Sequence, residues 1–192
     1  MKFSATPAPQ GLYDPQYERD ACGVAAVADI KGRRSHSIVS NGVTALINLD
    51  HRGAAGADPA VGDGAGILIQ VPDRFLREVA GFALPAKGAY AVGLAFLPAD
   101  AGDAEKAQSA IEGILAEEGL SLLGWRAVPT DPSTLGKTAR AVMPSFQQLF
   151  VADPGGATGV DLDRKLFVAR KRIEHDLPGE QRTYFPSLGS RT

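Results

Sequence analysis

The alternation of apolar runs with amphipathic segments in the second half of the chain constrains the fold most. Residues 103–118 are the clearest helix, because Ala107, Ile111 and Leu115 share one face and a glycine follows. The neighbouring elements are strands at 89–97, 120–128, 147–151 and 183–188 and a helix at 162–175. The pattern predicts a layered α+β or α/β chain. It leaves open whether the strands flanking helix 103–118 pair parallel or antiparallel.

The first half contains fewer large apolar residues and more glycine. A strand is expected at 23–30, a helix at 35–51, a strand at 66–71 and a short helix at 73–80. Asn41-Gly42 could break the first helix, but we favour one continuous helix that ends at Arg52-Gly53. Residues 53–66, GAAGADPAVGDGAG, form a loop whose backbone can approach a ligand closely.

Composition excludes several classes of protein. The formal net charge of -2 argues against a nucleic-acid binder, and no apolar run is long enough to span a membrane. A single cysteine, Cys22, excludes a disulfide framework and any cysteine-rich cluster, and we expect no metal and no cofactor in this chain. The three histidines are scattered, at His36, His51 and His175.

Residues 1–21 have the character of a polar leader. They contain three prolines and no apolar core, so they do not form a secretory signal, and a cytoplasmic protein is expected. We therefore expect a propeptide at 1–21 and a domain at 22–192.

Cys22, directly after the leader, has two interpretations. A lone cysteine is most often a small buried core residue. If the leader were removed after Ala21, however, Cys22 would carry a free α-amino group with a pKa of about 7.7–8.0. That amine could act as general base for the Cys22 thiol, so that one residue supplies both nucleophile and base for acyl transfer.

Arg52 also has two interpretations. At a helix end it could hold a carboxylate with two parallel hydrogen bonds, or it could simply complement the helix dipole from solvent. The glycines that follow are not a phosphate-binding loop, because no Gly-Lys-Ser/Thr and no GxGxxG spacing is present.

Two motifs carry a family resemblance. Ala21-Cys22-Gly23-Val24 and the segment HRGAAGADPAVGDGAGILIQVP (51–72) resemble the start of glutamate synthase large subunits, and weaker similarity continues through PSFQQLFV to SLGSRT. That region is a class II glutamine amidotransferase domain with an N-terminal-nucleophile (Ntn) fold, an α+β four-layer α/β/β/α sandwich, which would be incomplete at the C-terminus here.

The resemblance implies roles for two residues only. Cys22, exposed by removal of the propeptide, would attack the side-chain amide of glutamine, and Arg52 would bind the glutamine α-carboxylate. Asp58 and Asp63 are assigned to the shape of the loop, with a ligand contact by Asp63 as the less favoured alternative. His51 is expected to be structural.

The resemblance also implies groups that this chain does not carry. Flavin mononucleotide (FMN), an iron–sulfur cluster and NAD(P)H or ferredoxin would belong to the full-length enzyme, which passes ammonia to 2-oxoglutarate. The oxyanion hole and the aspartate that binds the substrate amine would come from beyond Thr192. The synthase domains and a small electron-donating subunit are the implied partners. The alternatives are another class II amidotransferase, similar to the amidophosphoribosyltransferases, or an inactive truncated module.

Overall fold

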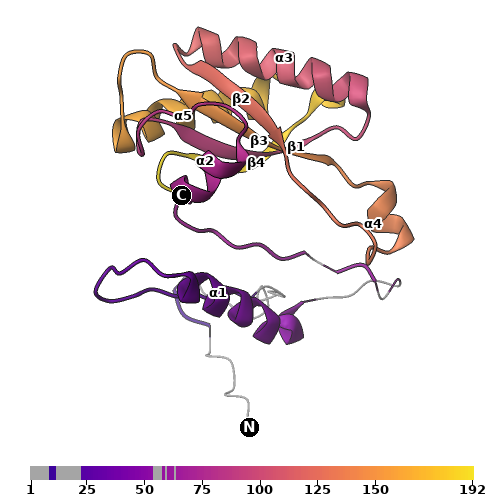
Figure 1. Cartoon of the computed structure of the whole chain (residues 1–192). Helices are drawn as coiled ribbons and strands as arrows, with labels where there is room; N and C mark the ends of the chain where they lie inside the picture. The colour runs from indigo at the N-terminus through magenta and orange to yellow at the C-terminus, as the bar shows by residue number, and fades with distance from the viewer. Residues whose placement is uncertain (1–8, 12–22, 54–57, 59, 63) are drawn as a thin grey trace. The chain divides into compact units, whose positions relative to one another are not determined.

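The chain divides into two units, residues 1–67 and residues 68–192. A computed structural model describes residues 9–11, 23–53, 58, 60–62 and 64–192 (Figure 1). In the first unit, helix α1 spans His36–Asn48 and the 3-10 helix η2 spans Asp50–Arg52. The predicted helix is therefore confirmed, and it continues through Asn41-Gly42 without a break.

The strands expected at 23–30 and 66–71 are wrong. Both segments lack strand structure, and Val24 and Leu68 have exposed fractions of 90% and 71%. An apolar run becomes a strand only when a neighbouring strand pairs with its backbone groups. Neither run has such a ladder among the residues that the structure describes.

The second unit contains a four-stranded antiparallel sheet. Its elements are α2 (Asp73–Val79), β1 (Ala91–Leu97), α3 (Ala101–Glu117), β2 (Ser121–Ala127), α4 (Lys137–Ala141), β3 (Ser145–Ala152), α5 (Gly159–Asp176), η3 (Gly179–Gln181) and β4 (Tyr184–Gly189). The strand order is β2-β3-β1-β4. Because β3 pairs antiparallel with both β1 and β2, these two strands run parallel with β3 between them. This βαββαβ topology is the split βαβ arrangement. The two strands that flank α3 therefore do not pair with each other, although the sequence analysis expected them to pair either parallel or antiparallel.

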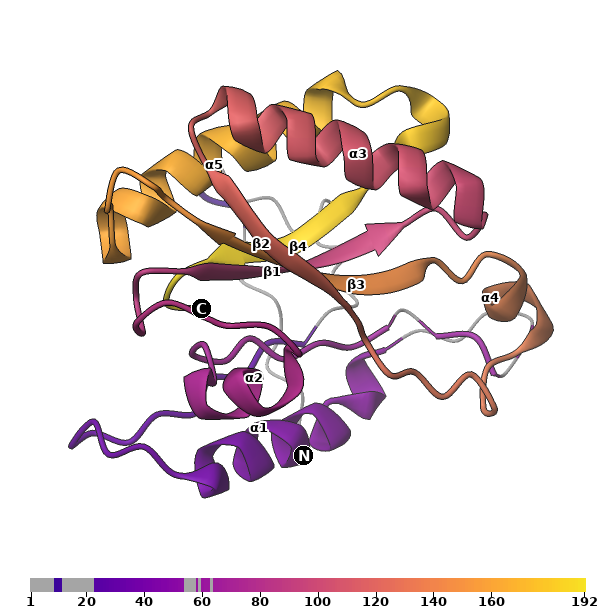
Figure 2. The ribbon, with the colours of Figure 1, turned by 45° about the horizontal axis from the view of Figure 1, so that its top comes forward.

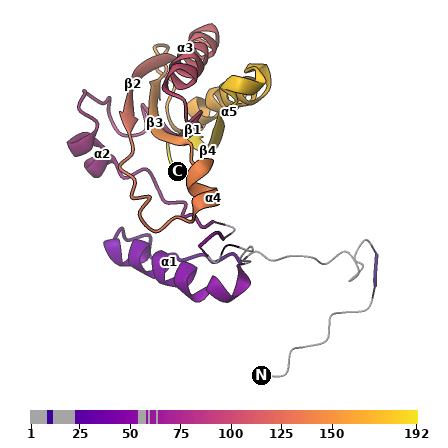
Figure 3. The same ribbon diagram turned by 90° about the vertical axis from the view of Figure 1, so that its right-hand side faces the viewer.

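Helices cover the two faces of the sheet unequally (Figures 2 and 3). Helices α3 and α5 lie on one face, where Ile111, Leu166 and Ile173 pack on the small residues Ala91 and Ala95. Helix α2 lies on the other face. The core there is smaller and contains buried Leu76, Tyr90 and Phe150.

The helices and strands expected after residue 72 are confirmed, with ends that shift by a few residues. The two elements that the sequence did not predict there, α4 and η3, are short and lack a repeating apolar face. A bulge in β4 places Phe185 and Leu188 on the same face of the sheet although they are three residues apart.

The two ends of the second unit lie next to each other. The backbone N–H of Val71 donates a hydrogen bond to the carbonyl oxygen of Arg191, at 2.8 Å. Residues 72–190 therefore begin and end at nearly the same point in space.

Candidate active site

Arg52 lies at the end of η2, and its side chain is exposed. Its backbone N–H donates to the carbonyl oxygen of Leu49 at 2.8 Å, and Gly53 N–H donates to Asp50 at 3.0 Å. No described residue accepts a hydrogen bond from the Arg52 guanidinium. The turn therefore fixes the backbone of Arg52 and leaves its side chain exposed.

Gly23, the residue that follows Cys22, lies against the start of this turn. A β-carbon at Gly23 would lie 2.8 Å from Leu49 Cδ2, closer than real side chains approach. Leu49 thus touches Gly23 and also supports the backbone of Arg52. The two sequence motifs meet at Leu49, which the sequence analysis missed, although the glycine at position 23 was a signal for close packing.

Helix α1 also contacts the end of the glycine-rich segment. A β-carbon at Gly42 would lie 2.9 Å from Ile67 Cδ1. A glycine inside a helix costs about 1 kcal/mol relative to alanine. The atom that approaches Gly42 is the terminal methyl group of an exposed side chain, which can move aside.

The remaining candidate residues have local roles or lie outside the described residues. His51 Nδ1 lies 2.9 Å from the carbonyl oxygen of Asn48, which requires the Nδ1–H tautomer and agrees with a structural role. Asp58 Oδ1 accepts from the N–H of Ala60 at 3.0 Å and so shapes its loop. Cys22 and Asp63 lie outside the residues that the structure describes.

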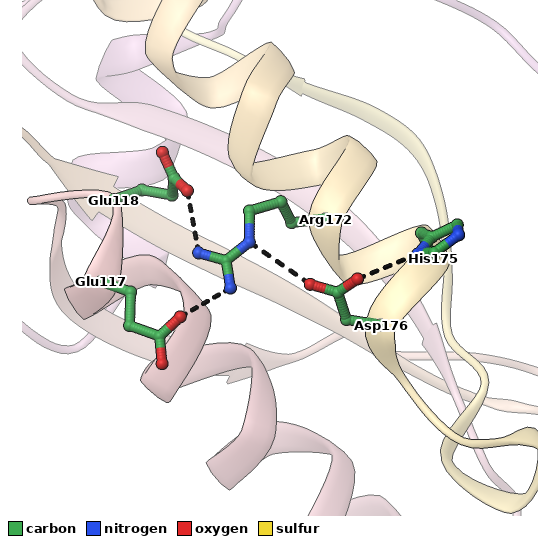
Figure 4. A network of polar contacts seen from close by, with 5 residues as sticks. All are labelled: Glu117, Glu118, Arg172, His175 and Asp176. Carbon is green, nitrogen blue, oxygen red and sulfur yellow. Dashed lines mark hydrogen bonds and ion pairs between the residues drawn. The ribbon is translucent and has the colours of Figure 1, made fainter.

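A charged network in the second unit joins α3 to α5 (Figure 4). The Arg172 guanidinium donates to Glu118 at 2.8 Å, to Glu117 at 2.6 Å and to Asp176 at 3.3 Å, and His175 contacts Asp176. The hydrogen bonds to the two glutamates raise the pKa of Arg172. Arg172 therefore stays charged, and the network joins the end of α3 to α5.

Two aspartates fix the N-terminal end of α5. The Asp153 carboxylate accepts from Lys165 at 2.8 Å and from the N–H groups of Gly155 and Ala157, which together lower the Asp153 pKa. Asp163 accepts from Ser190 N–H at 2.7 Å and from Arg191 Nε at 3.0 Å. The SLGSRT segment is therefore tied to α5 by Asp163, and both aspartates are occupied in structural contacts.

The described part of the chain offers no candidate metal centre. No group of three or more His, Cys, Asp or Glu side chains there could hold a metal ion. Within the same residues, no helix combines the length and apolar character needed to cross a membrane.

Comparison of the sequence with known protein families identifies the family that has these motifs. The model of the class-II glutamine amidotransferases matches residues 22–192. The chain belongs to this family. The resemblance noted from the Cys22 and HRG motifs is thereby confirmed.

The curated relatives of this amidotransferase chain are glutamate synthases. It is 39% identical to the glutamate synthase [NADPH] large chain of Bacillus subtilis over 100% of its own length and 13% of the relative. It is 39% identical to the glutamate synthase [NADH] of Schizosaccharomyces pombe (98% and 9%). It is 38% identical to a chloroplastic ferredoxin-dependent glutamate synthase of Oryza sativa subsp. japonica (91% and 11%). The chain thus spans about a tenth of the length of these relatives.

Proposed function

We propose that this chain carries the glutamine-hydrolysing nucleophile of a glutamate synthase, and that Cys22 is that nucleophile. The observation that carries the proposal is the family match, which begins at Cys22 and continues to residue 192. The names of the relatives support glutamate synthase over another class II amidotransferase.

In the proposed reaction, removal of residues 1–21 frees the α-amine of Cys22. The amine takes the thiol proton, and the thiolate sulfur bonds to the side-chain amide carbon of glutamine. The carbon–nitrogen bond breaks, the amine returns the proton to the leaving nitrogen, and ammonia departs. Water then hydrolyses the thioester, which gives glutamate and restores the thiol.

Arg52 is proposed to bind the α-carboxylate of glutamine. The proposal is supported by the exposed guanidinium on a hydrogen-bonded turn and by the contact between Leu49 and Gly23. Since Gly23 is covalently bonded to Cys22, a contact at Leu49 ties the nucleophile's chain segment to the segment that carries Arg52. A two-pronged guanidinium–carboxylate pair would then orient the substrate.

The wider assignments follow from the same proposal. We propose the four-layer Ntn sandwich for the complete domain, since the single sheet of the described residues does not test it. FMN, an iron–sulfur cluster, NAD(P)H or ferredoxin, the synthase domains and a small electron-donating subunit would belong to the longer polypeptide and its assembly. A cytoplasmic location is proposed from the polar leader, although some plant relatives are named as chloroplastic.

The experiment that tests this proposal is the intact mass of the purified chain after exposure to an electrophilic glutamine analogue. We expect loss of residues 1–21 and one added label, which Cys22→Ser abolishes. Arg52→Gln should slow labelling by at least tenfold, because one charge-assisted pair to a carboxylate is worth about 1.5–3 kcal/mol. His51→Gln is the matched control, and it should label at the wild-type rate. Labelling of the Cys22→Ser variant would contradict the proposal.

A further inference from the structure

Leu49 is held from both sides, at the point where helix α1 ends and the 3-10 helix η2 begins. Its backbone N–H donates to the carbonyl oxygens of Ala45 and Leu46, both at 3.1 Å. Its own carbonyl oxygen accepts a hydrogen bond from the N–H of Arg52 at 2.8 Å. The α-carbon of Leu49 is therefore fixed relative to the backbone of Arg52.

The side chain of Leu49 packs closely on Gly23. A β-carbon at Gly23 would lie 2.8 Å from Leu49 Cδ2 and 3.2 Å from both Cβ and Cδ1 of the same leucine. Rotation of the leucine side chain cannot relieve all of this crowding, because Cβ is bonded directly to the fixed α-carbon. The φ angle of Gly23 lies outside the left-handed region. This position therefore requires the small size of glycine and not its conformational freedom.

The contact sets how closely the chain at Gly23 approaches the turn that carries Arg52. Ordinary contact of a β-carbon begins at 3.4 Å, so an alanine at position 23 would push the two segments apart by about half an ångström. Consecutive α-carbons are covalently held about 3.8 Å apart. A displacement of Gly23 therefore also displaces the backbone of Cys22.

We propose that Leu49 is a positioning residue: through Gly23 it sets the distance between the Cys22 thiol and Arg52, and thereby the length of the substrate side chain that can react. This inference rests on the proposed function, in which Arg52 holds the α-carboxylate while Cys22 attacks the side-chain amide. Glutamine has one methylene more than asparagine between these two groups. A fixed spacing of nucleophile and guanidinium therefore selects glutamine.

The expected effects are large enough to measure. A displacement of about 1 Å in a positioned reactant can cost about 10²-fold in rate, so a shift of about half that size should cost roughly tenfold. A difference of one methylene between two substrates is worth roughly 10–200-fold in a selective site.

The test measures by intact mass how fast Cys22 is labelled in the wild type, Gly23→Ala, Leu49→Ala and the double variant. Three electrophiles are compared: a glutamine analogue, its asparagine-length homologue, and iodoacetamide, which has no α-carboxylate for Arg52 to bind. Because Cys22 is the only cysteine in the chain, each reagent has a single thiol to modify. Leu46→Ala, which shortens another half-buried leucine of α1, is the control. Circular dichroism confirms that each variant is folded.

We expect Gly23→Ala to react at least tenfold more slowly than the wild type with the glutamine analogue. The double variant should react at least fivefold faster than Gly23→Ala, because removal of the two leucine methyl groups leaves Cβ, at 3.2 Å, as the nearest atom of that side chain. Leu49→Ala alone should lose at least fivefold of the preference for the glutamine-length reagent over the shorter one. Iodoacetamide should label every variant within twofold of the wild type, and Leu46→Ala should match the wild type with all three reagents.

Unchanged labelling of Gly23→Ala and Leu49→Ala by the glutamine analogue would overturn the inference. A double variant no faster than Gly23→Ala would overturn it too. So would an equal slowing with iodoacetamide, since the substitutions would then act on the thiol itself. An equal loss of length preference in Leu46→Ala would assign the effect to a loosened helix instead of to Leu49.

Failure of this inference can be separated from failure of the proposed function. A wild type that iodoacetamide labels, but neither analogue labels, contradicts the proposed function and the inference with it. A wild type that the glutamine analogue labels, with variants that behave alike, contradicts only the role of Leu49. If Gly23→Ala retains residues 1–21, Leu49→Ala decides the question, because it leaves the residues around the Ala21–Cys22 bond unchanged.

Discussion

The buried side chain of Tyr90 holds α2 and the loop after it in place. Its ring is fully buried, and its hydroxyl donates to Asp73 at 3.0 Å. Asp73 also pairs with Arg77, which donates to the carbonyl oxygens of Leu84 and Pro85. This network ties the residue before β1 to α2 and to the loop that follows α2.

The phenol of Tyr90 should lose its proton at a higher pH than an exposed tyrosine. Burial, together with the hydrogen bond to Asp73, raises the pKa of Tyr90 to about 12. Since the folded state holds the neutral phenol, the stability that it contributes is complete below pH 10 and is lost as the pH rises toward 12. Tyr90→Phe should lower the free energy of unfolding at pH 7 by about 1 kcal/mol, the worth of one hydrogen bond. It should also remove the latest step in an ultraviolet titration of the phenols, and a titration identical to wild type would contradict this assignment.

Two glycines make a matched pair for a second prediction. At Gly93 an added β-carbon would lie 2.9 Å from the carbonyl oxygen of Ser187, a backbone atom that cannot move without distorting the β1–β4 ladder. At Gly42 it would meet only Ile67 Cδ1, the end of a half-exposed side chain.

We expect Gly93→Ala to lower the free energy of unfolding by about 1–3 kcal/mol, the usual cost of overpacking. Gly42→Ala should be neutral or stabilising by up to about 1 kcal/mol, because alanine favours a helix. Urea unfolding of the two variants side by side decides the question. A Gly42→Ala variant less stable than Gly93→Ala would show that the contact near Ile67 is the tighter one.

At the scale of elements, α3 and α5 are joined by charge as well as by apolar packing. Arg172 on α5 reaches Glu117 and Glu118 at the end of α3, while Ile111 and Ile173 pack in the core below. The ion pairs are partly exposed, so salt screens them.

Arg172→Gln should therefore destabilise the fold at low ionic strength, and the difference from wild type should narrow in 1 M NaCl. Arg164→Gln is the control, because among the described residues Arg164 pairs with Asp161 alone, one turn away, and both side chains are largely exposed. Thermal unfolding at the two salt concentrations gives the answer. A deficit of equal size at both concentrations would mean that Arg172 acts through the packing of its carbon chain instead.

The sequence predicted the helices and strands of the second unit better than the elements of the first unit. The helices at 103–118 and 162–175 have apolar faces that pack on the sheet, so periodicity and burial agree. The runs at 23–30 and 66–71 have the apolar composition of strands but no partner among the described residues, and composition cannot supply one. Helix α4 was missed because five residues are too few to show a period.

At the scale of the whole molecule, the two units differ in how far their elements are buried. No residue of α1 is buried, whereas β1 and β3 lie in the middle of the sheet and are covered by α3 and α5. Amides in a core strand exchange through larger openings than amides in an exposed helix.

Hydrogen exchange should therefore be fastest in α1 and slowest in β1 and β3. Mass spectrometry of peptides from the intact chain measures both, with the edge strand β2 as an internal reference of intermediate protection. Protection of α1 equal to that of β3 would contradict this order and would mean that another surface covers α1.

The candidate site was predictable at the level of residue type but not of geometry. The sequence indicated Cys22 and Arg52 as nucleophile and carboxylate ligand, and both remain proposals. It could not indicate Leu49, because the contact with Gly23 joins residues 26 positions apart in the chain. Nor could it predict that Asp163 fastens the SLGSRT segment, since that pairing depends on how α5 lies beside β4.

The hydrogen bond between Val71 and Arg191 has a consequence for how this region can vary. A segment that starts and finishes at one point can be lengthened, shortened or exchanged without moving what lies on either side of it. The same adjacency would allow a circular permutant, with residues 71 and 191 joined by a short linker and new ends opened at the turn after β3. The sequence and length of residues 72–190 can thus vary independently of the motifs that precede them.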